Sequence, residues 1–221
     1  MIKKNLLFLW GTALLPLLLV LAFYGRLPDT IPTQFQNGTV GYGPRATIWL
    51  LAGLPFVCSA IFTIAPKVDP RRRNYRRFQG AYNLFASVLN LFLLLITGVI
   101  ISESLRPGWL PVDRLVIASL GVLFAVMGNF MPKTGSNFMF GIRTMWTIEN
   151  DEVWQRTNRL AGKLWFFGGI LVALLGLLPL SGMSLWFSAI LAMAILGILP
   201  VLYSFLLYRK LQGPDGPSGS R

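Results

Sequence analysis

Six stretches of the chain are apolar, uncharged and long enough to cross a lipid bilayer. They run over about residues 6–24, 46–65, 81–101, 115–131, 164–180 and 182–208. A bilayer core about 30 Å thick needs about 20 helical residues, and the longest gap between these runs has about 30 residues, too few for a separate soluble domain. The sequence therefore predicts an all-α polytopic membrane protein, with six transmembrane helices in a single domain over residues 1–210.

The two ends of the chain are expected to differ. The first run follows Lys3 and Lys4 as in a secretory signal, but it is too long and no small-residue cleavage site follows it, so we expect a retained helix. Residues 211–221 are rich in Gly, Pro and Ser, which predicts a disordered tail and resembles a cloning remnant. The tail is left out of the functional interpretation.

Basic residues are distributed very unequally between the loops. With the N-terminus in the cytoplasm, sixteen of the 20 Lys and Arg residues lie on cytoplasmic segments, and only Arg26, Arg45, Arg106 and Arg114 lie outside. This bias predicts cytoplasmic termini in a multi-pass membrane protein. The cluster at 70–77 is expected to contact anionic lipid, and with only Tyr75 among its arginines it does not predict direct nucleic-acid binding.

Few polar groups fall inside the apolar runs. Asn83 and Asn90 are seven residues apart and share one helix face, where they would either bond to a partner helix or line a cavity. Cys58 has no second cysteine to pair with, which predicts a packing role. The chain has no histidine, so a histidine-based metal site, proton switch or general base is excluded.

The two longest connecting segments carry most of the polar sequence. Residues 25–45 are predicted to form an outer loop of several turns, with a short extended piece at Ile31, Thr33 and Phe35. On the cytoplasmic side, Pro132 is expected to end the fourth helix, and a new helix is predicted to start near Asp151 and to continue into the fifth span.

Local pairs support that helix start. Thr147 and Asn150 are capping residue types, and Glu152 is spaced to pair with Arg156. Trp154 and Asn158 share a helix face with Ala161, while the neighbouring Arg and Lys side chains would reach the lipid headgroups.

The stretch from Gly141 to Arg159 has two interpretations. Interfacial tryptophans and snorkelling arginines commonly anchor helices at the headgroup level, which explains many of its residues. Anchoring does not require the density of polar and aromatic residues found at 141–147. The alternative is a folded cytoplasmic site with Arg143 as its central cation, braced by Trp146 and Trp154.

Three quoted stretches carry a resemblance. "GNFMPKTGSNFMFGIRTMWTIENDEVWQRTNRLAGKLW" at 128–165 closely resembles the signature of the SdpI family of bacterial integral membrane proteins. "LPDTIPTQFQNGTVGYG" at 27–43 is similar to an N-terminal domain of unknown function that many of these proteins carry, and "DPRRRNYRRFQGAYN" at 69–83 looks like the family's loop before the third span. The resemblance covers most of the chain outside the tail.

The resemblance implies a set of site residues. The ligand- or partner-binding positions are Asn129, Lys133, Asn137, Gly141, Arg143, Thr144, Trp146, Thr147, Trp154, Thr157, Asn158 and Arg159, and the outer-loop positions are Pro28, Pro32, Gln34 and Phe35. Three positions depart from the family pattern: Gln34 and Asn158 stand where it has His, and Met145 stands where it has Pro. Glutamine and asparagine keep hydrogen bonding but do not titrate, which favours structural or binding roles there.

The resemblance also implies a function. The family's named member protects a producing cell against its own secreted killing peptide and recruits a transcriptional repressor to the membrane. The prediction is therefore a membrane immunity and signalling protein, with lipids around it, a peptide toxin on its outer face and a repressor on its cytoplasmic face. We expect no catalytic residues, cofactor or metal.

Two alternatives stay open. A transporter needs polar groups at membrane depth, and the spans offer only a few asparagines. A lipid-modifying enzyme would need facing acid and base groups, whereas Glu149, Asp151 and Glu152 are adjacent at a helix start.

Overall fold

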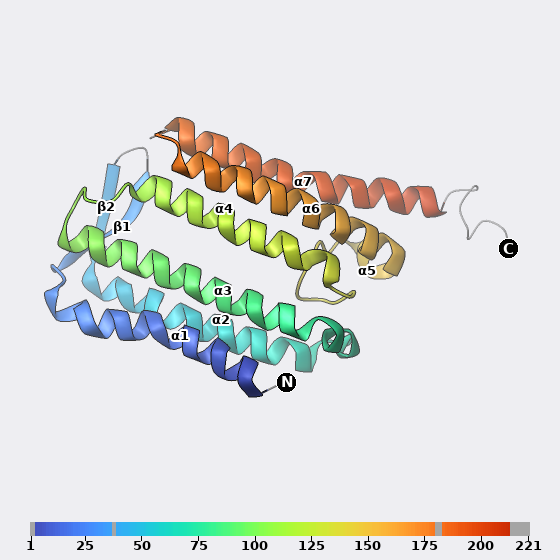
Figure 1. Ribbon diagram of the computed structural model, residues 1–221, viewed down its shortest axis with the longest axis horizontal. Helices are drawn as coiled ribbons and strands as arrows, with labels where there is room; N and C mark the ends of the chain where they lie inside the picture. Colours follow the sequence, from blue (N-terminus) through green and yellow to red (C-terminus); the bar gives the residue numbers. More distant parts are fainter. Residues whose placement is uncertain (1–2, 37–38, 180–182, 213–221) are drawn as a thin grey trace.

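The computed structural model describes residues 3–36, 39–179 and 183–212, and within them it is dominated by long helices (Figure 1). The long helices are α1 (Lys3–Phe23), α2 (Ile48–Val68), α3 (Arg72–Leu105), α4 (Val112–Phe130), α6 (Asp151–Leu177) and α7 (Met183–Gln212). The short elements are the helix α5 (Met145–Glu149), the strands β1 (Thr30–Gln36) and β2 (Thr39–Pro44), and the 3-10 turns η1 (Tyr24–Arg26), η2 (Arg45–Thr47) and η3 (Met131–Lys133).

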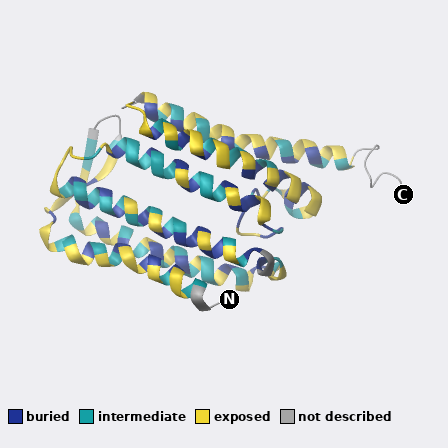
Figure 2. Ribbon diagram, in the orientation of Figure 1, coloured by how far each residue is buried: buried dark blue, intermediate teal, exposed yellow. Residues whose placement is uncertain are grey.

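The six long helices confirm the predicted membrane architecture. Their apolar segments cover Asn5–Arg26, Arg45–Val68, Phe78–Leu105, Val112–Lys133, Asp151–Leu177 and Ser184–Gln212, each long and apolar enough to cross a bilayer. Exposed residues lie along the outward faces of the long helices, where lipid tails would cover them (Figure 2). Large apolar side chains such as Phe167 and Leu206 are among the exposed residues.

Helix α7 continues to Gln212, two residues into the segment predicted as a tail. Residues 213–221, which make up the rest of the predicted tail, lie outside the described residues, as do residues 180–182 between the last two spans.

The helices form two groups of three, with α1, α2 and α3 in one and α4, α6 and α7 in the other (Figure 1). Asn90 ties the first group together from a fully buried position. Its amide nitrogen lies 3.2 Å from the Leu9 carbonyl oxygen on α1, 3.3 Å from Thr12 Oγ1 and 2.9 Å from Ser59 Oγ on α2. The predicted interhelical role is therefore observed at Asn90, whereas the amide nitrogen of the buried Asn83 has no partner among the described residues.

Glycines bring α4 and α6 into backbone contact in the second group. A Cβ atom on Gly121 would lie 2.3 Å from the Ala173 nitrogen, and one on Gly128 would lie 2.3 Å from the Phe166 nitrogen. From the other side, a Cβ on Gly169 would lie 2.4 Å from the Ala125 nitrogen. No larger residue fits at these positions without separating the helices.

The segment between α1 and α2 forms a β-hairpin at one end of the bundle, the hairpin end. Strand β1 pairs antiparallel with β2, from Thr30 opposite Pro44 to Gln36 opposite Thr39, with an irregularity between Pro32 and Gln34. The extended piece predicted around Ile31 is confirmed. The second strand was not predicted, because glycine and proline, which occur at 41, 43 and 44, are depleted in strands.

Candidate functional site

The segment that joins α4 to α6, residues 131–150, folds back over the opposite end of the bundle from the hairpin (Figure 1). We call it the connecting loop, and this end of the bundle the loop end. Helix α4 ends at Phe130, two residues before Pro132, as the sequence predicts. Most of the predicted site residues lie on this loop or on the first turns of α6.

Asp69 fixes the connecting loop to the start of α3. Its side chain is 4% exposed, and Oδ1 accepts a bond from the Arg71 nitrogen at 2.7 Å. Oδ2 accepts from the Tyr75 hydroxyl at 2.7 Å and from the Phe138 nitrogen at 2.9 Å. One buried carboxyl group thus joins the α2–α3 turn, the first turn of α3 and the connecting loop.

Asn137 organises the loop from within. It is 1% exposed, and its Oδ1 accepts from the backbone nitrogens of Met139 at 2.9 Å and Phe140 at 2.7 Å. Its amide nitrogen donates to the carbonyl oxygens of Gly135 at 2.8 Å and Phe140 at 3.0 Å. Each hydrogen-bonding group of this side chain is engaged, which gives the turn a single defined shape.

Tyr75 lies just outside the membrane-spanning part of α3 and donates to Asp69. Burial raises the pKa of its hydroxyl well above the usual value, and the bond to Asp69 raises it further, while the charge of Arg143 acts in the opposite direction. The hydroxyl therefore stays protonated at physiological pH and remains a donor.

Gly141 adopts a conformation that suits only glycine. Its φ is +115°, and a Cβ there would lie 2.6 Å from Asn158 Oδ1 and 3.1 Å from a ring carbon of Trp154. Asn158 Oδ1 accepts from the Ile142 nitrogen at 2.8 Å, and the buried Trp154 indole donates to the Thr134 carbonyl oxygen at 3.0 Å. The shared face of Trp154, Asn158 and Ala161 is thus the surface of α6 on which the loop rests.

The second half of the loop is fixed to α7. Thr144 and Thr147 form a capping box at the start of α5, and the Thr147 hydroxyl also lies 3.0 Å from the Ile142 carbonyl oxygen. The Trp146 indole donates to Ser204 Oγ at 2.5 Å and packs against the Phe205 ring. Trp146 therefore docks this part of the loop onto α7.

The start of α6 agrees with the sequence prediction. The Asn150 side chain caps the helix by accepting from the nitrogens of Glu152 at 2.8 Å and Val153 at 3.2 Å. Glu152 pairs with Arg156 at 2.6 Å, as expected from their spacing.

Arg143 occupies a different environment from the one predicted. It is exposed and donates from Nη1 to the Phe138 carbonyl oxygen, while Trp146 and Trp154 are engaged with α7 and with Thr134. The arginine at the centre of the contacts is Arg71. Its Nη2 donates to the Ile148 carbonyl oxygen at 2.6 Å, and its Nη1 lies 3.4 Å from Asp151 Oδ1.

The remaining predicted residues are scattered. Asn129 is exposed and borders an apolar groove between α3, α4 and α6, away from the loop contacts. Thr157 is fully buried, and its hydroxyl has no partner among the described residues. Lys133 and Arg159 are exposed and line a polar cavity beside the connecting loop.

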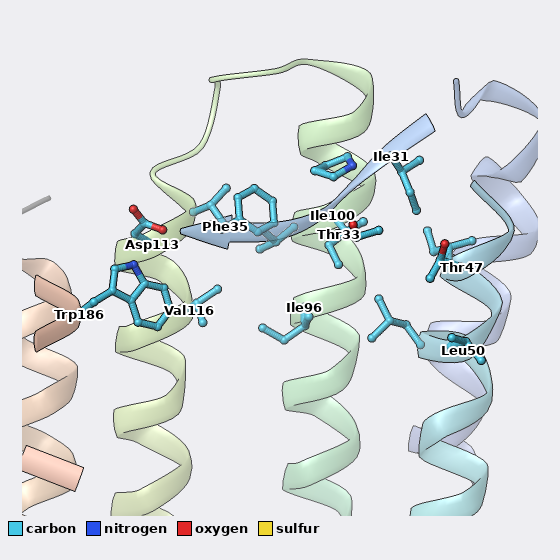
Figure 3. A pocket seen from close by; sticks show the side chains of 15 residues that line it. Ile31, Thr33, Phe35, Thr47, Leu50, Ile96, Ile100, Asp113, Val116 and Trp186 are labelled. Carbon is cyan, nitrogen blue, oxygen red and sulfur yellow. The ribbon is translucent and has the colours of Figure 1, made fainter. Parts of the chain in front are cut away.

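A second, larger cavity opens at the hairpin end (Figure 3). Its volume is about 450 Å³, and its walls come from β1, α2, α3, α4 and α7. The lining is apolar except for a few groups, which include the Asp113 side chain and the Trp186 indole; these face each other at one end in Figure 3. The indole nitrogen is buried and has no partner among the described residues.

Two of the four predicted outer-loop residues line the hairpin-end cavity and two do not. Pro32 and Phe35 line it, and Phe35 lies near Asp113 and Trp186 (Figure 3). Pro28 and Gln34 are exposed and do not contribute to the lining. Gln34 instead lies against Gly41 of β2. A Cβ atom added to Gly41 would lie 3.2 Å from the Cβ atom of Gln34.

Two known protein families match parts of this chain. The SdpI/YfhL protein family matches residues 133–204, which include most of the connecting loop, α6 and much of α7. The domain of unknown function DUF1648 matches residues 11–56, which include the hairpin. The resemblance to the SdpI family is confirmed.

One curated relative aligns along most of the chain. It is the immunity protein SdpI of Bacillus subtilis (strain 168), 23% identical over 196 residues, which cover 86% of this chain and 89% of the relative. No solved structure matches the chain. The protein is accordingly a multi-pass bacterial membrane protein that is similar to the SdpI family and to this immunity protein.

Several residues of the loop-end network were not predicted as site residues. Asp69, Arg71, Tyr75 and Ser204 contact loop residues that are about 60 to 80 positions away in the chain. The available signal was Asp69, a single acid two residues before a run of arginines. An acid at that position satisfies backbone donors at a helix start, and here it also accepts from the loop.

Proposed function

We propose that this protein gives the cell resistance to a secreted, membrane-active peptide, with the hairpin end facing outside and both termini in the cytoplasm. The observation that carries the proposal is the apolar cavity of about 450 Å³ beneath the hairpin, which has the character of a ligand site: mostly apolar walls with a few polar groups. Resemblance to an immunity protein supports the same role.

The chemistry of the cavity fits an apolar segment that carries positive charge and a free carbonyl group. Asp113 can pair with a cationic group, and the Trp186 indole can donate to a carbonyl oxygen. The apolar walls would bury the remainder of the segment in competition with the lipid tails.

The exposed surface of the connecting loop is the proposed partner site. Arg143 is exposed there, and the same loop exposes Phe138, Met139 and Met145, by 41%, 39% and 80%. Arginine, aromatic residues and methionine are enriched at protein interfaces. The proposed partner is a cytoplasmic regulatory protein such as a repressor.

Survival of cells exposed to a panel of membrane-active peptides tests the resistance function. Expression of the protein should shift the survival curve for at least one peptide. Ile96→Trp, which fills the cavity, should abolish the shift at matched membrane abundance. Leu95→Trp adds the same bulk on the neighbouring, 41% exposed position and should retain it. No shift for any peptide, together with solute movement or lipid turnover by purified protein, would replace this proposal with the transporter or enzyme alternative.

The partner site is tested separately by Arg143→Lys and Arg156→Lys. Lysine keeps the charge and loses the planar guanidinium. Arg156 pairs with Glu152 on α6, so it serves as the matched control. Loss of signalling to a co-expressed reporter with Arg143→Lys alone is expected, whereas equal behaviour of the two variants would argue for a lipid anchor.

A further inference from the structure

A polar cavity of about 250 Å³ lies at the loop end, between the connecting loop, the first turn of α3 and the first turns of α6. It is separate from the exposed surface around Arg143, whose side chain does not line it. The loop wall includes Lys133 and Ser136, and the α6 wall includes Gln155 and Arg159. Cations therefore face this space from two elements.

The charge balance of the cavity is positive. Asp151 is the acid in its lining, and it already pairs with Arg71, 3.4 Å away. Lys133 lies over the Phe130 ring, with its amino group 5.5 Å from the ring centre, and neither Lys133 nor Arg159 forms a salt bridge within the described part of the chain. Two exposed cations are thus available to a ligand.

Ser136 provides an independent indication of a ligand. The residue is 4% exposed, and its backbone carbonyl oxygen accepts from the Asn74 amide at 2.7 Å. Its hydroxyl, in contrast, has no hydrogen-bond partner among the described residues. Buried polar groups are nearly always satisfied in folded proteins, so a hydroxyl left unpaired beside a polar cavity points to a group that enters the cavity.

We propose that this cavity binds a phosphate group, carried either by an anionic lipid headgroup or by a soluble phosphate compound. Arg159 can donate two parallel bonds to phosphate oxygens, Lys133 adds a point charge, and the Ser136 hydroxyl adds a neutral donor. The inference is independent of the resistance function, because it concerns a different end of the molecule and a different ligand.

Binding is measured on the purified full chain in two arms. In the first, inorganic phosphate is titrated onto protein in nanodiscs of phosphatidylcholine alone. In the second, native mass spectrometry counts the phosphatidylglycerol molecules retained by protein extracted from membranes that contain this lipid. Phosphate binding assigns a soluble ligand, and retention of one lipid assigns a headgroup. Failure of both arms overturns the proposal and leaves the survival assay unaffected.

Three variants connect the binding to the cavity. Lys133→Gln and Arg159→Gln should each weaken binding about tenfold or more, as expected for the loss of a charge-assisted hydrogen bond. Arg156→Gln is the control, since this residue is exposed, pairs with Glu152 and lies outside the lining. Equal loss in all three variants would mean general attraction to a charged surface and would overturn the proposal.

Ser136→Ala separates ligand binding from folding. Removal of an unpaired buried hydroxyl should leave the unfolding midpoint without ligand unchanged or higher. The same change should weaken binding several-fold and reduce the stabilisation that the bound anion provides. A lower midpoint without ligand, with binding unchanged, would assign the hydroxyl to the fold and contradict the proposal.

Discussion

The two ends of the bundle use opposite kinds of interaction. At the loop end, Asp69, Asn137 and Asn158 are almost completely buried. Asn137 bonds to backbone groups within the loop, and the side chains of Asp69 and Asn158 accept from loop backbone groups 69 and 16 residues away. At the hairpin end, an apolar cavity of about 450 Å³ lies under a two-stranded hairpin, and the ion pair of Asp29 with Arg45 is exposed at 3.8 Å. Buried hydrogen bonds hold the loop end in one shape, and the hairpin end contains an apolar cavity.

This difference changes how the dense sequence motif is understood. A concentration of Gly, Thr, Trp and Asn residues suggests ligand contacts, yet most of these side chains hold the loop to α3, α6 and α7. Only the exposed remainder, which includes Arg143, Lys133 and Arg159, is available to other molecules. The buried polar side chains of this motif therefore fix the backbone of the loop, and the exposed side chains are the candidates for contacts with other molecules.

The largest effect is expected for Asp69→Ala. The change leaves the Tyr75 hydroxyl and the Phe138 nitrogen without their acceptor, so the free energy of unfolding should fall by about 3 kcal/mol. Unfolding by SDS titration in mixed micelles measures it. Asp151→Ala, which removes an acid with a 77% exposed side chain from the same end, should cost about 0.5 kcal/mol or less. Equal losses would contradict the role of buried bonding at the loop end.

Gly141 lies in the connecting loop and Gly108 lies between α3 and α4 at the hairpin end (Figure 1), so alanine at these two positions compares the two ends directly. Both glycines have a positive φ, +115° and +78°, but only Gly141 has neighbours close to a new Cβ. Gly141→Ala should lower the free energy of unfolding by about 2 kcal/mol or more, and Gly108→Ala by about 1 kcal/mol, from backbone strain alone. The same titration measures both, and a larger cost at Gly108 would reverse the comparison.

Alkaline pH should weaken the loop end through Tyr75. The pKa of this tyrosine is raised in the folded protein, so its stabilising contribution is complete below the unfolded value of about 10 and is lost as pH rises above it. The loss should be about 1.4 kcal/mol per pH unit in that range. Unfolding at pH 9 to 11, compared with Tyr75→Phe, isolates it, because the variant lacks this part of the slope. Parallel slopes would refute the assignment.

The smallest effect is expected for an indole at the hairpin end. Trp186→Phe removes a nitrogen that has no partner among the described residues, so the free energy of unfolding should change by about 0.5 kcal/mol or less. Trp154→Phe removes a buried donor to the Thr134 carbonyl oxygen and should cost about 1 to 2 kcal/mol. SDS titration of the two variants compares one indole from each end, and a costlier Trp186 change would show that the cavity is part of the core.

Local rules predicted much of the fold and part of the site. Apolar run length gave the six spans, and capping and charge spacing at Asn150, Glu152 and Arg156 gave the start of α6. The contacts of Asp69 and Arg71 with the connecting loop were beyond prediction, because they depend on how α3 packs beside the loop and no spacing rule reaches so far along the chain. The predicted bracing of Arg143 by two tryptophans was wrong for the same reason. The Trp146 indole bonds to Ser204 on α7, and the Trp154 indole bonds to the Thr134 carbonyl oxygen.

The glycine contact between α4 and α6 has a mechanical consequence. Where two backbones touch, no layer of side chains can compress or shear, so the pair behaves as one stiff rod across the bilayer. One end of this rod carries Asp113 in the wall of the hairpin-end cavity, and the other carries Met131 at the start of the connecting loop. The rod therefore links the wall of the hairpin-end cavity to the start of the connecting loop at the other end of the bundle.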